Sequence, residues 1–335
     1  MDATSYRKIF RDIVVGKSEV KIDDTKFYIK HLSSLDQVDI DDIRAEYFEK
    51  ALSRGIPKQE DLLNDLRKEG TWTDADEDAI DKQRLYIDQL RAAKPQLLLK
   101  SQIDAQNKNI EEGEIKLQEL LNKKNDLIGL NAEDYADKRS NDYYIIKSFY
   151  EDPDLKNPVF PSEEDFNDLY SDDVAKFIQT YNKAFAMFEE LKIQEMILQD
   201  FYYIYFPFSD DTVGFFGNPV CHLTYNQLKL IVYTKIFKNI FEQNSHIPDK
   251  IKKDPKALLD YGSISDEAKD KMKKKLSGGN SAGTTLMGAT KEDYEYAGIE
   301  QSSSGAQLSL HEAAEKKGGS LSMEDLMELS GYKTK

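Results

Sequence analysis

The chain has 335 residues and a formal charge of −16, with 62 acidic against 46 basic residues. This charge disfavours a nucleic-acid coat protein, because neutralising phosphates needs a basic surface. The single cysteine, Cys221, excludes an intramolecular disulfide and a cysteine-based zinc cluster. No run of about 18 consecutive apolar residues occurs, so we expect no membrane span and a reducing, cytoplasmic setting.

Alternating apolar and polar residues predict a β-hairpin over about 18–32. The pair Asp23-Asp24 interrupts the alternation and predicts the turn. The alternating positions on its two sides are Val20, Ile22, Phe27, Ile29 and His31. A helix is expected to follow Ser33 and to end at Gly55, and a shorter helix ends at Gly70. Together these elements predict an α+β region over residues 1–72.

Residues 73–150 predict a helical arm. Thr73 is an expected N-cap, and the helix that it starts reaches Pro95, where it either kinks or gives way to a second helix. Beyond Pro95, apolar residues recur at heptad spacing: Ile103, Ile110, Leu117, Leu120 and Leu127. Gln106 and Gly113 interrupt this seam. We expect the arm to pack on the 74–93 helix or on a second copy of the chain, which would make the protein a homo-oligomer.

Asn131 predicts the cap of a further helix in this arm, and Pro153 opens an extended connector after it. Residues 151–276 then predict an aromatic-rich helical domain. We expect one helix over 172–206, ended by Pro207, and a second from Thr224 to about Glu242, packed as an antiparallel pair.

The composition of residues 277–335 predicts a flexible, disordered tail that carries one short amphipathic helix. The apolar positions of that helix are Leu321, Met323, Leu326, Met327 and Leu329. The predicted fold class is therefore mainly α, with a small N-terminal β-hairpin, a coiled-coil-like helical arm, a helical core and a disordered tail.

The sequence predicts no catalytic, cofactor-binding or metal-binding residues. Asp74, Asp76 and Asp78 have the spacing of the first ligands of a calcium loop. Ala79 and Leu85 occupy the positions where that loop needs glycine and glutamate, so we interpret the acids as a charged helix start.

The neighbours Cys221 and His222 also lack the geometry of a nucleophile and its base, because adjacent residues of an extended segment point in opposite directions. The expected alternative is a cysteine buried as a small hydrophobic residue, next to a histidine that lies on the surface or in the core.

The aromatic residues of 201–206, together with Phe215 and Phe216, have two interpretations. Such residues form a core in most proteins, and they are also favoured anchors of protein–protein interfaces. We therefore name Phe215 and Phe216, with the apolar positions of the tail helix, as the candidate partner-binding residues.

Four stretches resemble tail proteins of large tailed bacteriophages in their order along the chain. They read YIKHLSSLDQVD, EGTWTDADEDAIDKQRLYIDQL, LNKKNDLIGLNAEDYADKRSND and KKDPKALLDYGSISDEAKDKM. The resemblance is to the tail assembly chaperone and baseplate-hub assembly group. It implies a non-enzymatic chaperone or scaffold that binds tape measure or hub subunits in the host cytoplasm.

Two alternatives remain open at this point. A structural baseplate-hub subunit that stays in the virion tail would have the same sequence features. A metal-dependent hydrolase would need several scattered carboxylates, among them Asp74, Asp76 and Asp173, to meet in one pocket.

Overall fold

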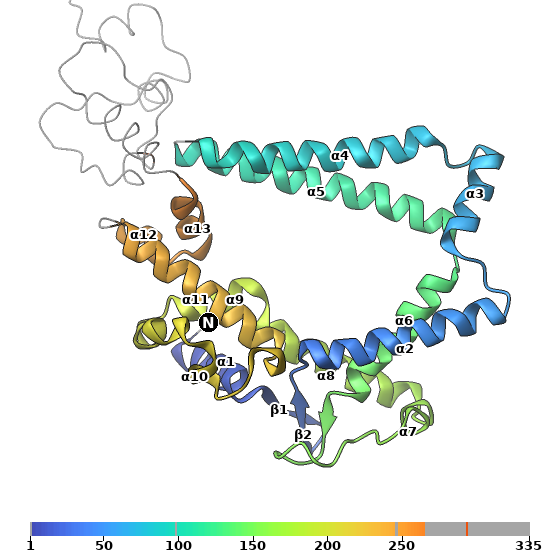
Figure 1. Cartoon of the computed structure of the whole chain (residues 1–335), viewed down its shortest axis with the longest axis horizontal. Coiled ribbons are helices and arrows are strands. Elements are labelled where there is room, and N and C mark those ends of the chain that lie inside the picture. The colour runs from blue at the N-terminus through green and yellow to red at the C-terminus, as the bar shows by residue number, and fades with distance from the viewer. Residues whose placement is uncertain (1, 98, 245–246, 265–292, 294–335) are drawn as a thin grey trace, which may run out of the picture. The chain divides into compact units, whose positions relative to one another are not determined.

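The computed structural model describes residues 2–97, 99–244, 247–264 and 293 (Figure 1). These residues form a mainly helical protein with one small antiparallel sheet, which confirms the predicted fold class for the described part of the chain. The chain divides into two units: Met1–Glu77 with Asn122–Asn239, and Asp78–Leu121 with Ile240–Lys335. Each unit therefore combines two stretches that are distant in sequence.

The first unit begins with helix α1 (Ala3–Val15), which the sequence analysis does not predict. Asp2 caps its start by accepting a hydrogen bond from the backbone of Ser5 (2.9 Å). Gly16 ends it with a φ of 74°, a conformation that costs glycine no steric strain. The apolar face at helical spacing, including Ile9 and Ile13, is buried.

The predicted hairpin is confirmed as strands β1 (Lys17–Ile22) and β2 (Thr25–Lys30). Val20 lies opposite Phe27, and Asp23 adopts a positive φ of 53° in the turn. A short third strand, β3 (Phe149–Tyr150), pairs with β2, giving the order β1-β2-β3. This third strand comes from a segment more than a hundred residues away, so local alternation does not reveal it.

Helices α2 (Ser34–Ser53) and α6 (Ala132–Ile146) lie side by side and antiparallel (Figure 1). The Tyr144 hydroxyl donates to the Gln37 side chain (2.7 Å), and Lys147 pairs with Asp39 (2.9 Å). The short predicted helix that ends at Gly70 is α3 (Gln59–Glu69).

Asn131 caps α6 as the sequence predicts. It is 2% exposed, and its side-chain oxygen accepts from the backbone N–H of Asp134 (2.8 Å). Replacing Asn131 with alanine should lower the free energy of unfolding by about 1 kcal/mol, since the backbone N–H of Asp134 loses its capping acceptor. Urea denaturation followed by the fluorescence of Trp72, the single tryptophan, measures this loss. Asn131→Ser keeps a capping oxygen and should recover most of it.

Aromatic side chains fill the core beside the sheet, where α7 (Glu163–Asn167) and α8 (Ser171–Phe185) supply Phe166 and Phe177. The ring of Phe177 lies 5.0 Å from the rings of both Phe149 and Phe160. Such edge-to-face pairs add to the free energy gained from burying the rings.

The prediction of one helix over 172–206 is wrong. The chain here forms α8, then η2 (Ala186–Phe188), α9 (Glu190–Ile197) and the 3-10 helix η3 (Asp200–Asp210). Pro207 lies inside η3 and does not end it. Tertiary contacts set this arrangement: the Tyr202 hydroxyl, deep in the unit, shares a 2.8 Å hydrogen bond with Thr234.

Three further elements continue this part of the chain: α10 (Thr212–Phe216), η4 (Val220–His222) and α11 (Tyr225–Gln243). The predicted start of α11 is confirmed, because the hydroxyl of Thr224 accepts from the backbone of Gln227 (3.2 Å).

The arm is formed by α4 (Asp74–Ala93) and α5 (Lys100–Ile128), which are joined through η1 (Lys94–Gln96). Within the second unit, the two helices pair antiparallel (Figure 1). Gln106 and Gly113, which interrupt the predicted heptad seam, lie where α4 and α5 contact each other. Gln106 donates to the carbonyl of Leu90 (2.8 Å), and a Cβ on Gly113 would lie 3.1 Å from Ile87. The arm therefore pairs within one chain.

Leu127, predicted for the seam, is 37% exposed, whereas its neighbour Ile128 is buried.

The second unit also contains α12 (Asp249–Lys252) and α13 (Pro255–Ser263). At the start of α5, the carboxylate of Asp293 accepts from the backbone N–H of Ser101 (2.9 Å).

Candidate functional site

Large apolar side chains of the first unit are exposed on η3, α10 and η4. We call this the η3–η4 surface and define it by Ile204, Phe208, Val213 and Val220. Their exposed fractions are 67%, 59%, 50% and 51%, respectively. Its elements also supply core residues, since Tyr202 and Phe206 are buried. The aromatic stretch thus serves as core on one side and as an apolar surface on the other.

The candidate residues Phe215 and Phe216 lie on α10, beside this surface, and are half-buried. Their rings are 4.7 Å apart at nearly a right angle, and Phe215 contacts Tyr205 (6.0 Å between ring centroids). Phe215 and Phe216 therefore pack against each other, and Phe215 also packs against Tyr205 of η3. The other candidates, Leu321, Met323, Leu326, Met327 and Leu329, lie outside the described residues.

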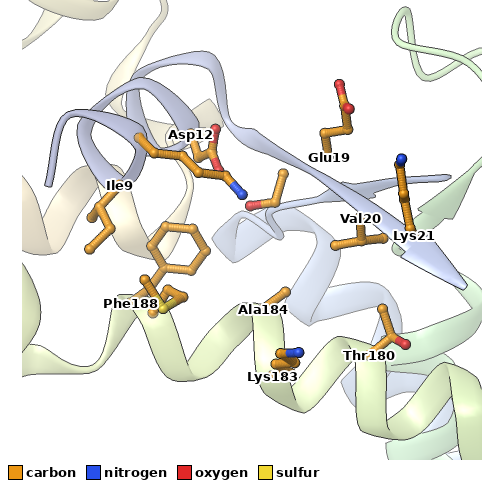
Figure 2. A pocket seen from close by; sticks show the side chains of 12 residues that line it. Ile9, Asp12, Glu19, Val20, Lys21, Thr180, Lys183, Ala184 and Phe188 are labelled. Carbon is orange, nitrogen blue, oxygen red and sulfur yellow. The ribbon is translucent and has the colours of Figure 1, made fainter. Parts of the chain in front are cut away.

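A pocket of about 530 Å³ opens in the same unit, between α1 and β1 on one side and α8 and η2 on the other (Figure 2). Its floor is apolar and includes Ile9, Ala184 and Phe188. Exposed lysines lie around the floor, with Lys8 on α1 and Lys183 on α8. No motif or local pattern of the sequence predicts this pocket.

A buried polar pair lies behind the pocket floor. Ser18, which lines the pocket and is 4% exposed, shares a 2.8 Å hydrogen bond with Nε2 of His31. Nδ1 of His31 has no hydrogen-bond partner among the described residues. Burial lowers the pKa of His31 to about 4, so the ring is neutral at neutral pH. The proton belongs on Nε2, because a buried acceptor is left unpaired in proteins more often than a buried donor.

The carboxylates required by the hydrolase alternative do not meet. Asp74 is almost fully exposed, Asp76 accepts from Thr73 (2.7 Å), and Asp173 pairs with Lys176 (3.2 Å). In the part of the chain that the structure describes, no group of three His, Cys, Asp or Glu side chains is placed to hold a metal ion. The first-turn position of the acids of α4 agrees with a charged helix start.

Cys221 is exposed in η4, so the expectation of a buried cysteine beside His222 is wrong. The side chain packs into no core, because η4 is a short surface turn before α11.

Among the described residues, no helix has both the length and the apolar character needed to cross a bilayer. Comparison of the chain with protein-family models, with curated proteins and with solved structures found no match.

One signal in the sequence could have located the polar pair. In the hairpin register, Ser18 lies opposite Ile29, and the alternation places His31 on the same face as Ile29. The rest of the pocket needs α8, which lies about 160 residues further along the chain. Local patterns predict a helix there but do not indicate that it packs beside β1. Only the tertiary structure brings these elements together.

Proposed function

We propose that this chain is a non-enzymatic assembly protein of a bacteriophage tail, which binds other tail components such as the tape measure or hub subunits. The sequence resemblance supports the phage context. The η3–η4 surface supports the binding role, and it is the observation that carries the proposal.

Apolar side chains that remain exposed on one part of a protein are a common mark of a binding surface. Ile204 and Phe208 are the most exposed of the four. Burying such a side chain in a partner gains about 1.5–3 kcal/mol each. Two buried anchors of this size can account for a large share of a micromolar affinity, which corresponds to about 8 kcal/mol.

The test is co-expression of the chain with the tape measure or hub protein of the same tail gene cluster, followed by size-exclusion chromatography. We expect a stable complex with one of them. The double variant Ile204→Glu with Phe208→Glu should weaken that complex by about 100-fold or more, because the apolar contact is lost and two charges are buried.

A matched control places glutamate at two other exposed apolar positions of the same unit, Val38 (55% exposed) and Tyr170 (83% exposed). This variant should bind as the wild type does. If no tail protein co-elutes with the wild-type chain, or if both double variants bind equally well, the proposal is wrong.

A structural hub subunit remains the second candidate, since it would use the same surface. Mass spectrometry of purified, washed particles separates the two roles. A chaperone leaves before the tail is complete, whereas a hub subunit stays in the particle.

A further inference from the structure

We propose that the pocket between α1, β1, α8 and η2 binds an acidic peptide segment of a partner protein, with a large apolar side chain on the pocket floor. This inference deepens the proposed function and rests on it, because it names the chemistry of a segment that the partner must present.

The charges around the pocket favour an acidic ligand. Both acids of the lining are already paired with cations outside it: Asp12 with Arg11 (2.7 Å) and Glu19 with Lys26 (2.8 Å). In contrast, Lys8 and Lys183 have no hydrogen bond or ion pair among the described residues. The lining holds three lysines, Lys8, Lys21 and Lys183, against these two acids. Lys8 also acts electrostatically on Asp12, and Lys21 on Glu19, but each acid has its own cation partner outside the pocket. The net charge of the lining is therefore positive, in a chain whose net charge is −16.

The floor favours a ligand that is also apolar. Ile9 and Phe188 are 2% and 4% exposed and line the pocket together with Val20, Ala184 and Met187. Figure 2 shows Val20 on the strand facing Ala184 on α8, while Glu19 and Lys21 extend away from α8. The volume of about 530 Å³ lies within the range of ordinary ligand sites, so a leucine or phenylalanine side chain has room there.

One buried polar group adds directionality. With the His31 proton assigned to Nε2, the ring donates to the Ser18 hydroxyl 2.8 Å away, and the hydroxyl's own hydrogen remains able to donate to a ligand in the pocket. A peptide carbonyl or carboxylate is the natural acceptor. The combination of a buried apolar floor, a buried hydroxyl and exposed cations matches the core and rim of a protein–peptide interface.

The experiment measures fluorescence polarisation of a labelled peptide, GEDFLEDG, with its ends acetylated and amidated, on the full-length chain. Its amide twin, GQNFLQNG, has the same apolar centre without the charges. We expect the acidic peptide to bind and its twin to bind at least about tenfold more weakly. Raising the NaCl concentration should weaken binding of the acidic peptide and leave the affinity of its amide twin unchanged.

Replacing Lys8 and Lys183 with glutamine should weaken binding of the acidic peptide by about tenfold, since each exposed ion pair contributes modestly. Both side chains are exposed, so the fold is expected to survive.

The control variant replaces Lys138 and Lys229 with glutamine; these are two exposed lysines of the same unit that lie outside the pocket lining. It removes the same charge and should bind as the wild type does. A third variant, Ala184→Phe, fills the floor and should also reduce binding.

If both lysine variants lose the same affinity for the acidic peptide, the effect is one of general charge and the proposal is wrong. Equal affinity of the wild-type chain for the two peptides would overturn it as well. If removal of residues 277–335 tightens binding, the chain's own acidic C-terminal sequence occupies the pocket, and a partner segment is not its ligand. Peptide binding that depends on Lys8 and Lys183 would stand even if no tail protein is captured, so the two proposals fail separately.

Discussion

Replacing Phe149 with alanine will lower the free energy of unfolding by about 3–5 kcal/mol, the loss expected for deleting a fully buried phenyl ring. Phe149 is 0% exposed and joins the sheet to the helical core. Its ring lies 5.0 Å from Phe177 and 6.5 Å from Phe27. The cavity left by the ring would lie at the centre of this aromatic cluster, where backbone pairing on β2 prevents full collapse.

Urea denaturation followed by Trp72 fluorescence measures this change. Phe208→Ala removes the same ring from a position that is 59% exposed, and it should cost less than about 0.5 kcal/mol. A loss below about 1 kcal/mol for Phe149→Ala would mean that β3 does not close the core as described.

The stability of the protein should fall as the pH is lowered from 7 to 4, because His31 is buried as a neutral ring. Its folded pKa of about 4 lies below the usual 6.5, so the unfolded chain takes up a proton that the folded protein excludes. The contribution of the neutral His31 ring to the free energy of unfolding is complete above about pH 6.5 and is lost as the pH falls. We expect a loss of about 2 kcal/mol at pH 5 and about 3 kcal/mol at pH 4.

The surroundings of His31 support this direction. The groups that face the ring are the Ser18 hydroxyl and the rings of Phe185 and Phe188, at centroid distances of 5.8 Å and 4.6 Å from the imidazole. No carboxylate forms a hydrogen bond or ion pair with His31 among the described residues, so nothing there compensates a positive charge.

Denaturation at a series of pH values provides the measurement. His31→Gln should be less stable at pH 7 but should show a much flatter profile between pH 7 and 5, where few carboxylates titrate. His222, which is exposed in η4, provides the control, and His222→Gln should keep the wild-type profile. A wild-type stability that is constant between pH 7 and 5 would contradict the buried neutral ring.

Glu163 makes the stability of the protein depend on pH in a second, more acidic range. Hydrogen bonds donated by the hydroxyls of Tyr47 and Tyr143 lower the pKa of this carboxyl below its usual value. Its contribution to stability is therefore present at neutral pH and is lost only below about pH 4.5, which lies below the range of pH 7 to 5 in which the His31 variant is compared with the wild type.

Much of the fold follows from local features of the sequence. The alternation around Asp23 fixed the hairpin and its turn, because side chains of a strand alternate between faces. Asn131 and Thr224 marked helix starts, since their side chains satisfy backbone donors within three residues. Asp254 likewise caps α13 by accepting from Ala257 (3.0 Å).

The predictions that were wrong lie where distant contacts override local preference. The aromatic stretch from 172 to 206 has helical spacing throughout, yet it breaks into four elements so that Tyr202 can reach Thr234. Helix α1 differs from these cases, because Tyr6, Ile9 and Ile13 give it an apolar face at helical spacing that is visible in the local sequence.

The sequence by itself determined the class of the fold, the hairpin turn and the helix caps at Asn131 and Thr224, because each depends on residues a few positions apart. The tertiary structure alone decided which aromatic residues are exposed on the η3–η4 surface. It also placed the lysines of α1 and α8 around one apolar floor. Burial and charge compensation depend on neighbours that are distant in the chain, and no local pattern records them.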